Sequence, residues 1–327
     1  NIIMVAFDEI LRLIEQSIRG LVFNDPPKSL FEPVTYTLSL GGKRIRPALT
    51  LMAYNIYKED VSSALDVAMG LEVFHNFTLL HDDLMDEADM RRGQPTVHKV
   101  WDANTAILSG DAMLIAAYRL VAKADKVHLK PALDLFTQTA LEICGGQQYD
   151  MEFEKRDDVA EEEYIEMIRL KTAVLLACAL KMGAILADAP AEDAEHLYHF
   201  GIAIGLAFQL QDDLLDVYGD PKTFGKNIGG DILCDKKTFL LINAFKRSNE
   251  QQKEVLKRWI GTASVDPQAK IAAVTDIYNQ LHLKQLSEEK IEAYFTEAMS
   301  HLDALNVEPV KLAALKEISH LLMNRKS

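Results

Sequence analysis

The chain has 327 residues, enough for a large hydrophobic core, and 49% of them are hydrophobic. No apolar run reaches the roughly 20 residues of a membrane-spanning helix, so we expect no integral membrane segment. The apolar start, Ile2 to Phe7, is too short for a secretory signal. Lys and Arg total 35 against 49 Asp and Glu, and the net charge of −14 argues against a nucleic-acid partner. Any site for an anionic substrate must therefore be built locally, from metal ions and a few cations.

The cysteines give a prediction about redox environment. Cys144, Cys178 and Cys234 have no spacing typical of a metal site. Disulfides are rare in the cytoplasm, where thiols are kept reduced. We therefore interpret the three residues as reduced thiols in the core of a cytoplasmic protein.

Helical periodicity dominates the sequence, and the alternation typical of strands is nearly absent. An apolar stripe at helical spacing runs from Phe7 to Leu21 and is broken at residues 24–27, which include two prolines. The next helix should run from about Ser29 to Gly41-Gly42, because glycine is typical of a helix C-terminus. Further helices are expected over residues 46–57, 62–88, 104–124, 131–155, 161–187, 192–218, 235–248, 251–260, 268–282, 287–305 and 309–324.

Several of these predicted helices exceed 20 residues, which is long for a globular protein. The helix over 287–305 should begin at Ser287, with Glu288 and Glu289 in its first turn. Helices this apolar must bury themselves against one another. No linker or low-complexity segment divides them, so we predict one all-α domain over residues 1–327.

An acidic cluster, Asp82-Asp83-Leu84-Met85-Asp86, follows the apolar segment 73–81. Side chains four residues apart share one face of an α-helix, so Asp82 and Asp86 point the same way, while Asp83 lies about 100° from them. Like charges at this spacing cost a helix about 0.2–0.5 kcal/mol per pair, and aspartate is a weak helix former. Taken alone, the cluster is either a solvated acidic helix end or a site that gains stability from a cation.

A second cluster, Asp212-Asp213-Leu214-Leu215-Asp216, repeats the pattern after another apolar run, residues 202–210. Two such clusters, each closing a hydrophobic helix, are a strong signal. Carboxylates without a partnering Cys or His favour hard cations, and Mg²⁺ with water and phosphate oxygens is the usual solution. Two clusters facing one another would hold several Mg²⁺ ions and a diphosphate between them.

Two segments between the predicted helices are basic. Residues 41–47, Gly-Gly-Lys-Arg-Ile-Arg-Pro, place three cations beside flexible backbone. Lys binds phosphate as a point charge and Arg as a planar fork. Taken alone, however, this segment is better explained as a basic helix terminus than as a binding site. Residues 91–96, Arg-Arg-Gly-Gln-Pro-Thr, lie a few residues beyond the first acidic cluster. They suit either Mg²⁺ with a diphosphate or a surface patch of salt bridges.

The second half of the chain carries three further polar signals. Lys171 interrupts an apolar helical face, where it either extends its charge to the surface or reaches into a cavity. Gln209 precedes Asp212 and Asp213 by three and four residues, which places it on their face of the helix. Residues 219–231 form a Gly-rich, Lys-bearing segment without P-loop spacing or a preceding strand, so we interpret it as a flap rather than a nucleotide site. Taken alone, each of three scattered histidines is structural rather than a metal ligand: His75, His81 and His98.

The ordered set of motifs resembles the trans-isoprenyl diphosphate synthases, the polyprenyl synthetase family that includes farnesyl and geranylgeranyl diphosphate synthases. The resemblance spans nearly the whole chain and rests on Gly42-Lys43-Arg44-Ile45-Arg46-Pro47, both acidic clusters, Arg91-Arg92-Gly93, Lys171-Thr172, Phe208-Gln209 and the Gly225-Lys226 flap. It implies a single large bundle of long helices around a central cavity, and a cytoplasmic homodimer. The implied substrates are isopentenyl diphosphate and an allylic prenyl diphosphate: dimethylallyl, geranyl or farnesyl.

The resemblance also implies roles for individual residues. It makes Asp82 and Asp86 ligands of two Mg²⁺ ions and Asp212 the ligand of a third, with Mn²⁺ as a substitute and Asp83, Asp213 and Asp216 as outer members. The allylic diphosphate would be held by Arg91, Lys171, Lys226 and Lys236. Isopentenyl diphosphate would be held by Lys43, Arg46, His75 and Arg92.

The implied reaction begins when metals and cations stabilise the charge on departing diphosphate. The allylic carbon becomes a carbocation, which Gln209, the Thr172 hydroxyl and backbone carbonyls would stabilise. The double bond of isopentenyl diphosphate then attacks, and a proton is lost, plausibly to the released diphosphate. Water must be excluded, or the cation becomes an alcohol, and the flap would serve this purpose.

Product length should depend on what blocks the cavity below Asp82. Phe77 lies five residues earlier, about 7.5 Å along the helix, and Phe74 eight earlier, about 12 Å, while Thr78 is small. A lone aromatic five residues before the cluster resembles geranylgeranyl synthases of the archaeal pattern, and the bulk of Phe74 favours a shorter chain. We expect a C15 to C20 product; the alternative is that both rings only pack the core.

Two other functions use similar features. A class I terpene cyclase shares the helical fold and the first acidic motif, but its second metal motif usually mixes Asn, Ser or Thr with Glu. A non-catalytic subunit of a heteromeric prenyl synthase tends to lose one acidic cluster. Because this chain keeps two DDxxD clusters, the sequence favours a catalytically competent prenyltransferase.

Overall fold

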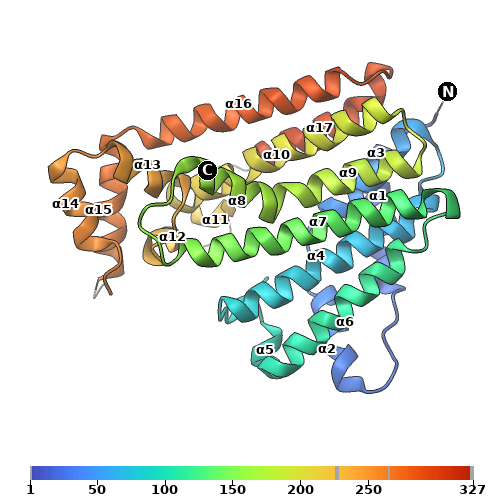
Figure 1. Ribbon diagram of the computed structural model, residues 1–327, viewed down its shortest axis with the longest axis horizontal. Helices are drawn as coiled ribbons and strands as arrows, with labels where there is room; N and C mark the ends of the chain where they lie inside the picture. Colours follow the sequence, from blue (N-terminus) through green and yellow to red (C-terminus); the bar gives the residue numbers. More distant parts are fainter. Residues whose placement is uncertain (1, 225–227, 264–265, 325–327) are drawn as a thin grey trace. The chain divides into compact units, whose positions relative to one another are not determined.

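The computed structural model describes residues 2–224, 228–263 and 266–324, and these are almost entirely helical (Figure 1). Within the described residues, regular strands are limited to β1 (Met90–Arg91) and β2 (Gln94–Pro95), which pair antiparallel in a short hairpin. The all-α class predicted from periodicity is therefore confirmed. The chain divides into two compact units.

Unit 1 comprises residues 1–138, 178–197 and 306–315. Its central helix, α4, is buried from Val67 to Phe74, where every residue except Glu72 is apolar, as expected for a core helix. It packs against α6, α3 and α1. The helices lying wholly in unit 1 are α1 (Phe7–Arg19), α2 (Lys28–Ser39), α3 (Ile45–Tyr57), α4 (Leu65–Met85), α5 (Val97–Val100) and α6 (Ala103–Val121), with a 3₁₀ turn at Val61–Ala64.

Unit 2 comprises residues 139–177, 198–305 and 316–327. Its own helices are α8 (Glu161–Ile168), α11 (Pro221–Phe224), α12 (Gly230–Leu233), α13 (Phe239–Arg247), α14 (Glu250–Trp259), α15 (Pro267–Gln280) and α16 (Leu283–Asp303), with a π-helical turn at Arg169–Ala173. Four helices contribute residues to both units: α7 (Lys126–Phe153), α9 (Val174–Leu186), α10 (Ala191–Tyr218) and α17 (Ala313–Met323), the last preceded by a 3₁₀ turn at Pro309–Leu312. The single domain expected over residues 1–327 stays a prediction.

Most predicted helices are present with bounds shifted by a few residues. The helices expected over 104–124, 192–218 and 251–260 correspond to α6, α10 and α14. The glycine pair behaves as expected at the end of α2, because Gly41 and Gly42 both adopt positive φ angles, 85° and 137°.

Three predicted helices are corrected by the structure. The helix expected over 161–187 is divided into α8 and α9 by the π-helical turn. The helix expected from 235 begins at Phe239, because the Thr238 side chain caps it by accepting a hydrogen bond from the Leu241 amide. The helix expected to begin at Ser287 starts at Leu283, after a tight turn in which His282 has a φ of 55°, and Ser287 is buried within it.

The interpretation of all three cysteines as core thiols is also wrong. None of the three forms a disulfide bond, but only Cys178 is buried, whereas Cys144 and Cys234 are exposed. Cys144 lies on an exposed stripe of α7 with Leu141, and Cys234 follows the last residue of α12, where the chain turns. Over the described ranges, none of the helices combines the length and the apolar character needed to cross a membrane.

Candidate active site

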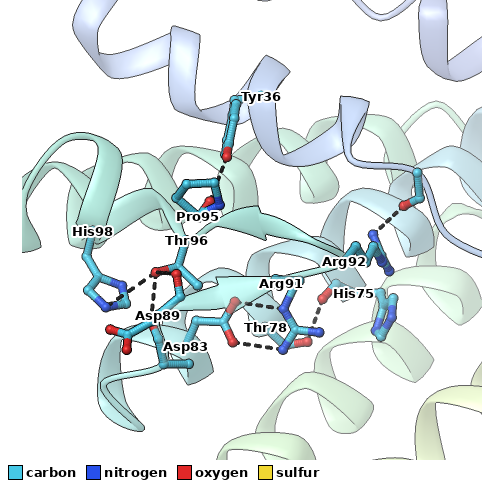
Figure 2. Close-up of polar contacts among 12 residues, drawn as sticks. Tyr36, His75, Thr78, Asp83, Asp89, Arg91, Arg92, Pro95, Thr96 and His98 are labelled. Atoms are coloured by element: carbon cyan, nitrogen blue, oxygen red, sulfur yellow. Dashed lines mark hydrogen bonds and ion pairs between the residues drawn. The ribbon is translucent and has the colours of Figure 1, made fainter. Parts of the chain in front are cut away.

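The first acidic motif closes α4 in unit 1. Asp82 is half-buried, and Asp86, which caps the helix, is exposed and donates its amide to the Asp82 carbonyl at 2.8 Å. Asp83 is buried and accepts hydrogen bonds from Nε and Nη2 of Arg91 at 2.7 and 2.8 Å, as Figure 2 shows. A forked pair of this kind holds both groups in one geometry. The motif is thus divided into an inward carboxylate bound by Arg91 and two carboxylates that reach the surface.

The hairpin of β1 and β2 positions the two arginines that follow this motif. Its two-residue loop, Arg92-Gly93, has φ angles of 51° and 78°, as the tight turns of hairpins require. The hydroxyl of Tyr36 donates to the Pro95 carbonyl at 2.6 Å, and the Thr96 hydroxyl donates to Ala88 at 2.7 Å. These contacts hold the hairpin against its own unit (Figure 2).

The glycine turn after α2 lies directly against this hairpin. Nη1 of Arg92 donates a hydrogen bond to the Gly41 carbonyl. A Cβ on Gly42 would lie 2.8 Å from Nη2 of Arg92, the movable end of a flexible side chain, so glycine is favoured here by its φ of 137° rather than by this contact. The two basic segments singled out in the sequence, 41–47 and 91–96, therefore meet within unit 1.

Arg44, the middle cation of the first basic segment, points inward. It is only 4% exposed and donates to Glu72, to Glu15 and to the Leu38 carbonyl, each at 2.8 Å. Its φ of 55° is unusual for a non-glycine residue. Arg44 is thus bound by the protein itself, whereas Lys43 is exposed beside it.

The arginines around His75 repel one another and disfavour a positive charge on its ring. Burial lowers the pKa of Arg46 to about 10; Glu72 opposes this shift and Arg92 adds to it. Burial, followed by the charges of Arg46 and Arg92, then of Arg91 and Arg44, holds the pKa of His75 well below its ordinary value. The buried Nε of Arg46 has no hydrogen-bond partner. A buried Nε without a hydrogen-bond partner, close to other cations, suits an anionic group as its ligand.

The second acidic motif lies on α10 in unit 2. Asp212 is half-buried, whereas Asp213 is 2% exposed and accepts hydrogen bonds from the Tyr164 hydroxyl and from Nε2 of Gln209, the latter at 3.2 Å. Burial raises the pKa of Asp213 to about 7, against the charge of Lys236 and the Tyr164 hydrogen bond. Gln209 lies beside Asp213, as its spacing predicted.

Lys171 lies in the π-helical turn and is paired rather than extended into solvent. Its Nζ is 2.6 Å from Oδ2 of Asp150 on α7. The Thr172 hydroxyl donates to Oε1 of Gln209 at 3.4 Å. A Cβ on Gly146 would lie 2.5 Å from the Lys171 amide nitrogen, so α7 and the turn are in close contact. Single π turns occur frequently at functional sites.

Lys236 lies among the carboxylates of unit 2. Partial loss of hydration lowers its pKa, but four carboxylates outweigh this effect and raise it above the ordinary value: Asp213, Asp231, Asp150 and Asp216. Asp216 is itself buried, and its Oδ2 accepts the Asp231 amide at 2.9 Å. Two of the predicted flap residues, Gly225 and Lys226, lie outside the described residues.

The residues expected to limit product length form an aromatic wall in unit 1. Phe74 is buried, with ring centroids 5.5 Å from Phe77 and 5.1 Å from Phe136. Phe77 is half-buried, and its ring contacts His81 at 4.8 Å. Thr78, also half-buried, donates to the His75 carbonyl at 2.6 Å. Phe77 is thus braced on two sides by other rings.

Sequence reasoning missed three residues that anchor these motifs. Asp150 pairs with Lys171, Tyr164 binds Asp213, and Glu72 binds Arg44. Asp150 lies shortly after a Gly-Gly-Gln-Gln segment, which is a weak signal. Glu72 is a single charged residue in the apolar part of α4, and Tyr164 lies on the glutamate-rich helix α8. Their importance arises from burial, which the sequence does not display.

The donor set of both motifs suits a hard cation, because the side chains that reach the surface carry only oxygen ligands. Among the residues that the structure describes, no three His, Cys, Asp or Glu side chains are gathered into a metal-binding group. Asp82 and Asp86 belong to unit 1, and Asp212 belongs to unit 2.

Comparison with known proteins agrees with the motifs. The family model described as polyprenyl synthetase matches residues 27–278. This chain belongs to the polyprenyl synthetase family. It is 40% identical over 264 residues to a short chain isoprenyl diphosphate synthase of Methanocaldococcus jannaschii, covering 80% of each chain. It is 35% identical to the geranylgeranyl diphosphate synthase of Methanosarcina mazei, covering 98% of each.

Solved structures extend the likeness to the whole fold of a polyprenyl synthetase. A crystal structure of a geranylgeranyl pyrophosphate synthase is 44% identical, with a TM-score of 0.94 over 99% of this chain and 100% of that one. The family predicted from the motifs is confirmed, and with it the class of enzyme, a trans-prenyltransferase that elongates prenyl diphosphates. The terpene cyclase and the non-catalytic subunit are not favoured.

Proposed function

We propose that this chain condenses isopentenyl diphosphate head-to-tail with an allylic diphosphate to give a trans prenyl diphosphate of C15 to C20. The observation that carries the proposal is the anion site of unit 1. There, Arg46 has a buried Nε without a partner, and His75 and Arg92 lie within its field. We assign this site, with the exposed Lys43, to the diphosphate of isopentenyl diphosphate.

The metal ligands in this proposal are the carboxylates that reach the surface. Asp82 and Asp86 would hold two Mg²⁺ ions and Asp212 a third, with Mn²⁺ as a substitute. When bound, these ions neutralise the charge that grows on the departing diphosphate. Asp83, Asp213 and Asp216 support the motifs from within, since each accepts hydrogen bonds from the protein.

In this proposal, four cations bind the allylic diphosphate: Arg91, Lys171, Lys226 and Lys236. Arg91 and Lys171 are each paired with a carboxylate, Asp83 and Asp150. These pairs orient the two cations before substrate binds, which lowers the cost of arranging them during the reaction.

The allylic cation would be stabilised by Gln209 and Thr172. The Thr172 hydroxyl donates to Oε1 of Gln209, whose Nε2 donates to Asp213. The amide is therefore held in one orientation with its dipole fixed by hydrogen bonds on both sides. The proton lost after condensation would go to the released diphosphate, so no protein nucleophile is required.

Two assembly properties belong to the same proposal. We place the enzyme in the cytoplasm, supported by three cysteines that form no disulfide bond. We also propose a homodimer, supported by large apolar side chains that α6 exposes: Ile107, Leu108 and Ile115.

Turnover by purified protein tests the function. Isopentenyl diphosphate is supplied with dimethylallyl, geranyl or farnesyl diphosphate and Mg²⁺, and products are separated by chromatography after dephosphorylation. The expected products are C15 to C20 alcohols, lost when the divalent cation is chelated. A cyclic hydrocarbon would indicate a terpene cyclase, and activity only after a second protein is added would indicate a non-catalytic subunit.

Arg46→Met tests the assignment of the anion site. The variant should raise KM for isopentenyl diphosphate at least tenfold and leave KM for the allylic diphosphate unchanged. Lys99→Met is the matched control, because Lys99 is an exposed cation of the same unit, paired with Asp89 at 3.2 Å. Equal changes in the two KM values would contradict the assignment.

A further inference from the structure

Unit 2 contains a buried lysine that none of the proposed chemistry uses. Lys270, on α15, is 1% exposed, and its Nζ lies 2.7 Å from Oδ1 of Asp235. Lysine is almost never fully buried unless it is paired, because removing its charge from water is costly. A buried ion pair of this kind suggests that it fixes the position of the segment that carries Asp235.

Asp235 lies at the point where the chain turns from α12 toward α13. Its φ is 55°, in the left-handed region that non-glycine residues rarely adopt. The turn is closed by hydrogen bonds from the Asp235 amide to Ile232, at 3.1 Å, and from the Lys236 amide to Asp231, at 3.0 Å. The carboxylate that pairs with Lys270 is thus adjacent to Lys236.

The other end of the same short segment binds the second acidic motif. The Gly229 amide donates to the Asp216 carbonyl at 2.7 Å, and the Asp231 amide donates to Oδ2 of Asp216 at 2.9 Å. Residues 229–236, which we call the α12 segment, therefore connect Asp216 at one end with Lys236 at the other.

One face of α15 packs on this segment, and Figure 1 shows α12 beside α15. A Cβ on Gly229 would lie 2.6 Å from Cδ1 of Ile271, so the Gly229 backbone is in close contact with the Ile271 side chain. Val274, one turn after Lys270, shares an apolar cluster with Ile232 of α12. The ion pair at the end of this four-residue helix adds a directional contact to the apolar packing.

We propose that Lys270 is a positioning residue, whose ion pair with Asp235 holds the α12 segment so that Asp216 and Lys236 keep their places in the site for the allylic diphosphate. The catalytic part of this inference rests on the proposed function. The structural part does not, because it concerns the segment itself.

Hydrogen exchange of the metal-free, substrate-free protein tests the structural part. In Lys270→Met, amides of residues 228–238 should exchange at least tenfold faster than in the unaltered protein. Lys316→Met is the matched control, since it removes another unit 2 ion pair, with Asp303 at 2.9 Å, from a more exposed position. Exchange within twofold of the unaltered protein, or equally faster exchange throughout unit 2, would overturn the proposal.

A second variant covers the possibility that Lys270→Met does not fold. Asp235→Asn removes the charge from the partly exposed partner, and asparagine tolerates the left-handed conformation. Asp235→Asn should speed exchange over the same residues. The separate single variant Lys270→Arg, which keeps the positive charge, should retain most of the protection seen in the unaltered protein. Unchanged exchange in Asp235→Asn would count against the pair.

Steady-state kinetics test the catalytic part. Lys270→Met should raise KM for the allylic diphosphate at least threefold and leave KM for isopentenyl diphosphate unchanged. A lower kcat with both KM values unchanged would show a merely structural role and would overturn the proposal. If the unaltered protein makes no prenyl diphosphate at all, the proposed function fails, while the exchange experiment still decides whether Lys270 holds the segment.

Discussion

At the scale of single residues, some charged side chains of this protein are paired with other residues, whereas others are placed to bind a ligand. Arg44 is satisfied by Glu72, Glu15 and a carbonyl. Arg46, two residues later, is half-buried, and its buried Nε has no hydrogen-bond partner. Alternate residues of one short basic segment therefore serve opposite purposes, and only their contacts in the folded protein distinguish them.

His75 provides a pH-dependent test of this cation cluster. Its pKa is lowered in the folded protein by burial and by the surrounding arginines, so the unfolded chain binds more protons below the ordinary value of 6.5. The free energy of unfolding should therefore decrease as the pH falls below 6.5, by up to about 1.4 kcal/mol per pH unit from this residue. Urea unfolding measured between pH 8 and pH 5 checks it.

His75→Gln should remove this loss of stability at acid pH, because glutamine does not titrate. Inorganic pyrophosphate bound to the cluster should raise the pKa of His75 in the unaltered protein, which NMR of the imidazole signals can follow. If His75→Gln shows the same loss of stability at acid pH, the histidine is not the group responsible.

Phe77 should set the length of the product. Phe77→Ala removes a half-buried ring from the aromatic wall. We expect longer prenyl chains on chromatography, because the smaller side chain leaves more room for the growing product. Phe74→Ala is added if needed, although this buried ring should cost about 3–5 kcal/mol of stability. Phe295→Ala, which removes a ring that contacts His320 in unit 2, is the control. An unchanged product length would rule out this wall as the limit.

At the scale of elements, the π-helical turn shows how a local irregularity places reactive groups. A regular helix over residues 161–187 would carry Lys171 along one apolar stripe. The extra residue per turn at Arg169–Ala173 instead gives Lys171 a partner on α7 and Thr172 a partner on α10. The periodicity of the sequence does not reveal the turn, because it depends on the close approach of Gly146.

Two adjacent glycines on α7 allow a controlled test of this turn. Gly146→Ala places a Cβ 2.5 Å from the Lys171 backbone, and such overpacking costs about 1–3 kcal/mol. It should also lower kcat by displacing Lys171 and Thr172. Gly145→Ala meets nothing within 4 Å, so it should stabilise the helix by about 0.5–1 kcal/mol and leave kcat unchanged. Thermal unfolding and turnover measure both effects, and equal behaviour of the two variants would refute the role of the turn.

Most elements could be predicted from sequence, and the errors have identifiable causes. Long apolar periodicity located α6 and α10 closely, because burial of one helical stripe is a repeated signal. Helix starts were less predictable. Ser287 resembles a cap but lies inside α16, since the turn at His282 starts that helix earlier. The hairpin of β1 and β2 was not predicted because two-residue strands contain no periodicity.

At the scale of the whole molecule, the exposed apolar face of α6 predicts assembly. Leu108 and Ile115 are 58% and 65% exposed and lie seven residues apart, on the same face of the helix. Replacing both with glutamate should convert a dimer to a 36.7 kDa monomer in sedimentation equilibrium. Val127→Glu, which alters an 82% exposed residue of α7, is the control. A monomeric unaltered protein would contradict the proposed homodimer.

The sequence by itself determined the all-α class, the family and the positions of both acidic motifs, because periodicity and ordered motifs are local properties of the chain. Only the tertiary structure decided which members of each motif face inward, that Nε of Arg46 is buried without a hydrogen-bond partner, and that Lys270 is buried against Asp235. Burial and pairing depend on residues distant in sequence, such as Glu72 for Arg44 and Tyr164 for Asp213. The energies of charged groups follow from those neighbours rather than from the residues themselves.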